Sequence, residues 1–241
     1  MNTSKLKILL AVAVISMAST IIGNFLLIKK APQFKLLSLP HGHSTHSGEV
    51  PLVGGIAIFI ALCFSLGFIQ ESLGLSTLSF LAFTFMVWLL GLIDDYNGLT
   101  PRIRLLAYIG TILLLQVVLN LSLNSLGHLL NSKDLVLPLP LNVIATILVM
   151  TGIINAFNMI DGIDGLASLV GLSSLAGIMV YADLNSDLQI LVIAVMLSAS
   201  IIGFLVFNIP GLTPTTLRCF LGDSGSTVIG FTISFLMLSL T

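Results

Sequence analysis

The sequence alternates long apolar runs with short polar segments. The runs are 15 to 23 residues long and cover 6–28, 53–69, 78–93, 105–123, 139–157, 166–182, 188–207 and 227–241. A helix needs about 20 apolar residues to cross a bilayer, whereas a membrane strand alternates in polarity over about 10. The pattern predicts an all-α, polytopic membrane helix bundle with about eight transmembrane helices. The loops leave no room for a soluble domain, so residues 1–241 are expected to form a single membrane domain.

The composition narrows the class of protein. Only 8% of the residues are charged, against about 25% in soluble domains, which excludes a water-soluble enzyme. The net charge is −1 and no basic stripe is present, so the sequence does not indicate nucleic-acid binding. The two cysteines, Cys63 and Cys219, show no spacing typical of a disulfide framework or a metal site.

The charged residues indicate an orientation. If the N-terminus lies outside, the loops at 29–52, 94–104, 158–165 and 208–226 share the inner face. They contain six of the nine basic residues, which agrees with the positive-inside tendency. Most of the acidic residues lie in the same loops, so we expect a site that faces the cytoplasm. Those acids are Glu49, Asp94, Asp95, Asp161, Asp164 and Asp223.

Three polar motifs lie at this predicted inner face. Asp94 and Asp95 end the third apolar run, where they either serve chemistry or reach into interfacial water. The second motif places polar groups three residues apart, which on a helix gives a winding polar stripe. Capping and interhelical bonding are the alternative interpretation of its members, Asn155, Asn158, Asp161 and Asp164.

The third motif is rich in small residues and precedes the last run. Gly222 and Ser224 flank Asp223 there, and the N–H groups of a helix start attract anions such as phosphate. An ordinary helix cap would explain the same residues. A further loop carries three histidines, including His46, but it has neither cysteines nor regular spacing, so we expect phosphate contact or solvation rather than zinc.

Together these groups predict one kind of chemistry. Carboxylate and amide oxygens are hard ligands suited to Mg²⁺ or Mn²⁺, and Arg102, Arg104 and glycine-flanked amides suit phosphate oxygens. A metal-dependent phosphoryl transfer at the membrane surface fits this set. It would join one water-soluble and one lipid-borne substrate.

Four motifs also resemble a known family. VPLVGGIAIF, GLIDDYNGLTPRIRLL, NAFNMIDGIDGLASL and FLGDSGSTVIGFT are similar, in order and spacing, to the polyprenyl-phosphate N-acetylhexosamine-1-phosphate transferases. The resemblance covers essentially the whole chain. Within the superfamily, 155–165 and 222–232 are most similar to the bacterial undecaprenyl-phosphate N-acetylglucosaminyl-1-phosphate transferases.

The resemblance implies a reaction in the bacterial cytoplasmic membrane. UDP-N-acetylhexosamine, with N-acetylglucosamine as the expected sugar, would donate sugar-1-phosphate to undecaprenyl phosphate, release UMP and initiate a lipid-linked surface glycan. The carried-over roles are catalysis for Asp94 and Asp95, Mg²⁺ binding for Asp223 and Asn158, and substrate binding for Asn155, Asp161, Asp164, Arg102, His46, Gly222 and Ser224.

The family continues beyond the point that corresponds to residue 241, so we expect a chain truncated at its C-terminus. The sequence leaves open a covalent or a one-step mechanism, a homodimer or a monomer, and two other functions. Those functions are an inactive truncated family member and a cation-coupled transporter.

Overall fold

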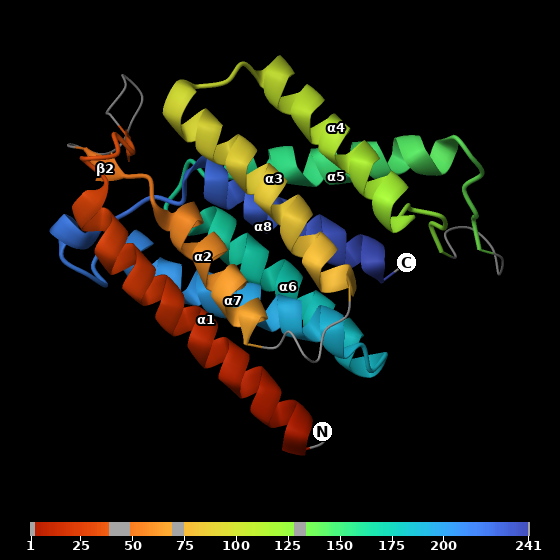
Figure 1. The fold of residues 1–241 in the computed structure, drawn as a ribbon, viewed down its shortest axis with the longest axis horizontal. Helices are drawn as coiled ribbons and strands as arrows, with labels where there is room; N and C mark the ends of the chain where they lie inside the picture. Colours follow the sequence, from red (N-terminus) through yellow and green to blue (C-terminus); the bar gives the residue numbers. More distant parts are fainter. Residues whose placement is uncertain (1–2, 39–48, 69–74, 128–133, 241) are drawn as a thin grey trace.

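The computed structural model describes residues 3–38, 49–68, 75–127 and 134–240, and within these ranges it is a bundle of eight α-helices (Figure 1). A short antiparallel pair, β1 (Leu37–Ser38) and β2 (Val50–Pro51), precedes the second helix. The predicted all-α membrane bundle is confirmed. The helices are α1 (Thr3–Lys30), α2 (Gly54–Gly67), α3 (Leu75–Asn97), α4 (Pro101–Leu119), α5 (Leu141–Ile160), α6 (Leu166–Leu184), α7 (Leu188–Asn208) and α8 (Gly222–Ser239).

Six of these helices are long and apolar enough to cross a membrane, namely α1 and α3 to α7. Helix α2 has only 14 residues. Helix α8 has 18, and its first turns are polar. The eight apolar runs therefore correspond to eight helices, but in the described ranges two of them do not meet the requirements for a spanning helix.

Several helices extend beyond the apolar runs that predicted them. Helix α3 continues to Asn97, α5 continues to Ile160, and α8 already begins at Gly222. The hydropathy of a segment reports whether its side chains prefer lipid and does not report its backbone angles. An apolar run therefore does not include the polar residues in the first or last turn of a helix. As a result, Asp94, Asn158 and Asp223 all lie on helix ends.

Helix α8 lies in the middle of the bundle, where it packs against α2, α3, α5, α6 and α7 (Figure 1). Glycines allow two of these contacts to be close. A Cβ atom on Gly55 would lie 2.2 Å from the backbone nitrogen of Gly225, and one on Gly91 would lie 2.6 Å from the carbonyl oxygen of Asp223. Small residues permit such close helix packing in membrane proteins.

Backbone hydrogen bonds place the start of α8 beside the start of α2. The N–H of Phe220 donates to the carbonyl of Pro51 at 2.8 Å, and Gly54 and Gly55 donate to the carbonyls of Phe220 and Leu221 at 3.0 and 2.9 Å. Two segments far apart in the sequence are thereby joined at one end of the bundle.

Candidate functional site

A cavity of about 850 Å³ opens at this end of the bundle. The ends of α3, α5 and α7 and the start of α8 contribute to its wall, together with the turn after α5 and the segment before α8. Seven of the predicted site residues line it, so the three motifs meet in space. They are Asp94, Asp95, Asn158, Asp161, Asp164, Gly222 and Asp223.

Asp94 is held by two hydrogen bonds at the end of α3. One carboxylate oxygen accepts the N–H of Leu99 at 2.6 Å, and the other accepts Nη1 of Arg104 at 2.6 Å. The residue is only 5% exposed. A buried carboxylate needs such partners, since an unpaired buried charge is costly. Asp94 therefore fixes the turn between α3 and α4 and orients Arg104.

Asp95 binds the N-terminus of α8. Its two carboxylate oxygens accept the backbone N–H groups of Asp223 at 2.7 Å and Ser224 at 3.0 Å. Gly222 has a φ of +75°, and a Cβ atom there would lie 2.9 Å from the Asp95 carboxylate. The helix-start amides that the sequence assigns to phosphate thus bind a carboxylate of the protein itself. Phosphate binding by these amides stays a prediction, and it requires Asp95 to move.

Asn158 connects the end of α5 to α8. Its side-chain amide donates to the Asp223 carboxylate and approaches the hydroxyl of Ser226 at 3.3 Å. The interhelical bonding that the sequence left open is therefore present. The side-chain nitrogen of Asn158, and not its carbonyl oxygen, faces Asp223, so Asn158 would bring its oxygen to a cation on Asp223 by turning its amide over.

Asp161 follows α5 directly, and within the described part of the chain its carboxyl group has no cationic partner to compensate a negative charge. In the described residues no cationic side chain lies within 4.0 Å of it. Burial raises the pKa of its carboxyl to about 8, and repulsion from Asp223, Asp95 and Asp164 adds to the rise. In the ligand-free protein Asp161 therefore retains its proton at neutral pH.

Asp164 forms an ion pair with Arg218, which comes from the segment before α8. The proposed capping role of Asp164 is not seen, because Gly165, with a φ of +74°, occupies the N-cap of α6. The buried side chain of Asn208 accepts the N–H of Gly165 at 2.6 Å and donates to the carbonyl of Cys219 at 3.1 Å. This residue fixes the turn against the end of α7.

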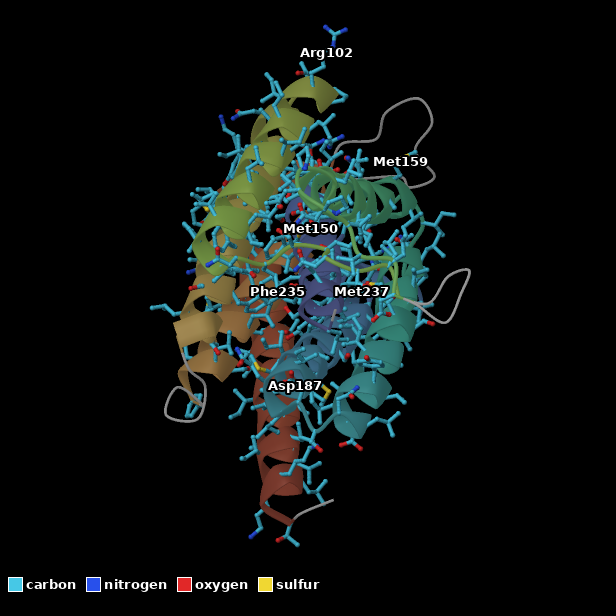
Figure 2. The ribbon with its side chains drawn as sticks, turned by 90° about the vertical axis from the view of Figure 1, so that its right-hand side faces the viewer. Arg102, Met150, Met159, Asp187, Phe235 and Met237 are labelled. Carbon is cyan, nitrogen blue, oxygen red and sulfur yellow. The ribbon has the colours of Figure 1, made fainter. Side chains whose placement is uncertain are left out.

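Arg104 and Arg102 occupy different surroundings. Nη1 of Arg104 bonds Asp94 and lies 3.7 Å from the Asp223 carboxylate. Arg102 lies at the start of α4 and points away from the bundle (Figure 2). Residues two apart on a helix do not face the same side. Among the described residues, Arg102 forms no ion pair with a predicted site residue, so its contact with phosphate stays a prediction.

Three other predicted residues lie outside the cavity wall or outside the described residues. Asn155 is half-buried one turn deeper on α5, and the hydroxyl of Ser224 is buried behind the wall. His46 lies outside the described residues. Gly222, by contrast, lines the cavity.

The sequence reasoning missed two residues of the site, Arg218 and Asn208. Each of them has a feature in the sequence that could have drawn attention to it. Arg218 is the basic residue of the predicted inner loop 208–226, and Asn208 is the first polar residue after an apolar run. Neither feature specifies a partner, because each partner comes from another part of the chain.

The donor atoms of the site fit a hard divalent cation. Asp223 offers a carboxylate and Asn158 an amide carbonyl, and Mg²⁺ usually takes one or two protein oxygens and completes its shell with water and phosphate. Among the described residues, no three acidic, histidine or cysteine side chains converge as metal ligands. The carboxylates of Asp94, Asp164 and Asp95 are engaged with Arg104, Arg218 and the α8 amides, respectively.

The fold and the site define a multi-pass membrane protein with a polar, acid-rich cavity at one end of its helix bundle. The chain belongs to glycosyl transferase family 4, which it matches over residues 77–241. This region includes every described site residue named above.

The chain is also similar to curated relatives from several bacteria. It is 33% identical to the undecaprenyl-phosphate alpha-N-acetylglucosaminyl 1-phosphate transferase of Escherichia coli O157:H7, over 88% of this chain and 57% of the relative. The protein of the same name from Salmonella typhimurium is 33% identical over 92% and 60%. A probable undecaprenyl-phosphate N-acetylglucosaminyl 1-phosphate transferase of Bacillus subtilis is 29% identical over 93% and 61%. The chain thus spans about 60% of the length of these relatives.

Proposed function

We propose that the protein transfers N-acetylhexosamine-1-phosphate, with N-acetylglucosamine as the sugar, from a UDP-sugar to undecaprenyl phosphate and releases UMP. The observation that carries this proposal is the meeting of six acids and amides from separate segments in one cavity at a helix-bundle end. The names of the relatives support both the sugar-1-phosphate and the lipid acceptor. The product would initiate a lipid-linked surface glycan.

The reaction would depend on Mg²⁺, with Mn²⁺ as a substitute. Asp223 and Asn158 would hold the cation, which would neutralise phosphate charge during transfer. Among the described residues, five carboxylates and one guanidinium, that of Arg218, line the cavity. Two phosphorylated substrates are repelled by this surface unless positive charge enters with them.

The carboxylates of the site act mainly by positioning. The lipid phosphate has a second pKa near 6 and is largely dianionic at neutral pH, so it attacks without a general base. Both oxygens of Asp94 accept a hydrogen bond, from Leu99 and from Arg104, and such bonds make a carboxylate a weaker nucleophile. We therefore favour one-step transfer, in which Asp94 holds Arg104 and Asp95 holds the start of α8. Arg218 and Asp164 would meet the nucleotide sugar.

The proposed setting is the bacterial inner membrane, with the cavity on the cytoplasmic side. The lipid acceptor would reach the cavity from the bilayer and the nucleotide sugar from the cytosol. The two ends of the bundle are clearly separated, with Arg102 near the cavity end and Asp187 near the other (Figure 2). The positive-inside tendency favours the cavity end as the inner one.

UMP release tests the proposal. The purified protein, supplied with undecaprenyl phosphate, UDP-N-acetylglucosamine and Mg²⁺, is expected to release UMP, and Asp223→Asn is expected to lose at least 99% of the rate. The matched control is Asp187→Asn at the other end of the bundle, where the side chain caps α7 by accepting the N–H of Ile190 at 3.0 Å. Asparagine caps a helix as well as aspartate, so the control should retain its rate.

The alternatives predict different results. Absence of UMP release by the wild-type protein would favour the inactive family member. Cation flux into proteoliposomes, lost in Asp223→Asn, would favour a transporter. The transporter has less support, since transporter sites lie near the bilayer midplane and these carboxylates gather at one end of the bundle.

A further inference from the structure

Arg104 joins acids from two helices. Its Nη1 lies 2.6 Å from one oxygen of Asp94, at the end of α3, and 3.7 Å from Oδ2 of Asp223, at the start of α8. The other oxygen of Asp223 is bound by Asn158. In the described residues, Arg104 is the one cationic side chain within 4.0 Å of Asp94 or Asp223.

This arginine supplies positive charge where carboxylates crowd together. The Asp223 carboxylate interacts unfavourably with the charge of Asp94, and the Asp95 carboxylate interacts unfavourably with that of Asp223. A guanidinium stays protonated at every physiological pH. Arg104 thus holds the acids together in the ligand-free protein without any bound ion.

A divalent cation bound by Asp223 and Asn158 would compete with this arrangement. The same Asp223 carboxylate cannot be fully shared by a guanidinium and a divalent ion, because like charges a few ångströms apart repel strongly inside a protein. Asp94 offers Arg104 a second, shorter contact that does not involve Asp223. The arginine can therefore release Asp223 and remain on Asp94.

We propose that Arg104 is the counter-ion of Asp223 in the ligand-free protein and that a divalent cation displaces Arg104 from Asp223 when it binds. The described contacts of Arg104 with these acids use Nη1 alone, and a phosphate that arrives with the cation would accept its other N–H groups if Arg104 turned toward the cavity. Arg104 is then a positioning residue whose charge lowers the affinity of the empty site for cations. The proposal rests on the proposed function for the cation site at Asp223 and Asn158 and for the identity of the phosphate ligand.

Mn²⁺ binding to the ligand-free protein, followed by electron paramagnetic resonance, tests this proposal without turnover. Arg104→Gln removes the competing charge and is expected to lower the Kd for Mn²⁺ about tenfold, since loss of one nearby charge is worth at least a factor of this order. Arg104→Lys retains the charge and should stay within threefold of wild type. Arg102→Gln removes the same charge from the exposed side of α4 and should not change the Kd.

A destabilised variant would still be informative. Arg104→Gln leaves Asp94 buried without its cationic partner, so the melting temperature of the variant is expected to fall. Saturating Mn²⁺ is expected to raise that melting temperature by more than it raises the melting temperature of the wild type. An unchanged or higher Kd in folded Arg104→Gln, or a destabilised variant that Mn²⁺ does not rescue, overturns the proposal.

The result is separable from the transferase proposal. If Arg104→Gln binds Mn²⁺ more tightly while the wild-type protein releases no UMP, the counter-ion role stands and the transferase proposal fails. If UMP is released and the Kd is unaffected by Arg104→Gln, the counter-ion role alone fails.

Discussion

Replacement of Asp95 by asparagine should destabilise the fold as well as the reaction. The carboxylate of Asp95 accepts two N–H groups at the start of α8, at 2.7 and 3.0 Å. Asparagine offers one carbonyl oxygen in place of two carboxylate oxygens and turns an N–H₂ group toward the second amide. One charged hydrogen bond is lost, and charged hydrogen bonds contribute about 1.5–3 kcal/mol each.

The favourable interaction of a negative charge with the helix N-terminus, about 0.3–1 kcal/mol, is lost as well. The variant also relieves the repulsion between the Asp95 and Asp223 charges, which offsets part of these losses, so we expect Asp95→Asn to lower the free energy of unfolding by about 1–3 kcal/mol. The protein has a single tryptophan, Trp88, seven residues before Asp95 on the same helix. Its fluorescence during SDS titration of the detergent-solubilised protein reports unfolding close to the altered site.

The control for this measurement is Asp187→Asn, in which the native aspartate accepts a single N–H. Asparagine can replace that one acceptor, so the unfolding midpoint should not move. If Asp95→Asn abolishes UMP release but unfolds at the wild-type midpoint, Asp95 acts only in the reaction and the structural reasoning is refuted.

Three further variants test other parts of the site. The pKa of the Asp161 carboxyl is about 8 in the folded protein and near 3.8 in the unfolded chain. Between these pH values unfolding releases a proton, so the stability of the protein falls as the pH rises. Asp161→Asn should therefore flatten the decline in melting temperature from pH 5.5 to 8.5, and equal slopes for the variant and the wild type would contradict the raised pKa. Gly55→Ala forces a methyl group into the backbone of α8 and should cost about 1–3 kcal/mol, whereas Gly67→Ala, with nothing within 4 Å, should cost nothing in the same SDS titration. Asn208→Ala leaves two backbone groups without their partner and should lower the unfolding free energy by about 2 kcal/mol; a wild-type midpoint would argue against this role.

Much of the fold followed from run length alone. Eight apolar runs became eight helices, and the sidedness of the loops predicted that Asp94, Asp161 and Asp223 would meet. The helix ends were less accurate, because polar residues extend α3, α5 and α8. The start of α4 was also missed, because the apolar run begins at residue 105 and the helix at Pro101. Thr100 followed by Pro101 is a typical helix beginning, and the Thr100 side chain accepts the N–H of Ile103 at 3.5 Å.

The partners within the site were not predictable in the same way. Asp95 lies 128 residues from the amide of Asp223 that it binds, and no local pattern encodes that pairing. A helix beginning at Pro101 does separate Arg102 from Arg104 by two positions and hence places them on different sides. Which of the two faces the acids depends on how α4 packs against α3, and this is a property of the assembled bundle.

The central position of α8 affects how the bilayer can influence the cavity. Nearly all residues of α8 are buried, whereas α1 and α4 expose large apolar side chains along their length. Changes in lipid thickness or lateral pressure act first on such exposed helices, through tilt. The first turn of α8 is tied to α3 by Asp95 and to α5 by Asn158, so tilting of the peripheral helices should leave the cavity walls in register. The cavity walls formed by α3, α5 and α8 should therefore be less sensitive to membrane composition than Arg104, which α4 carries.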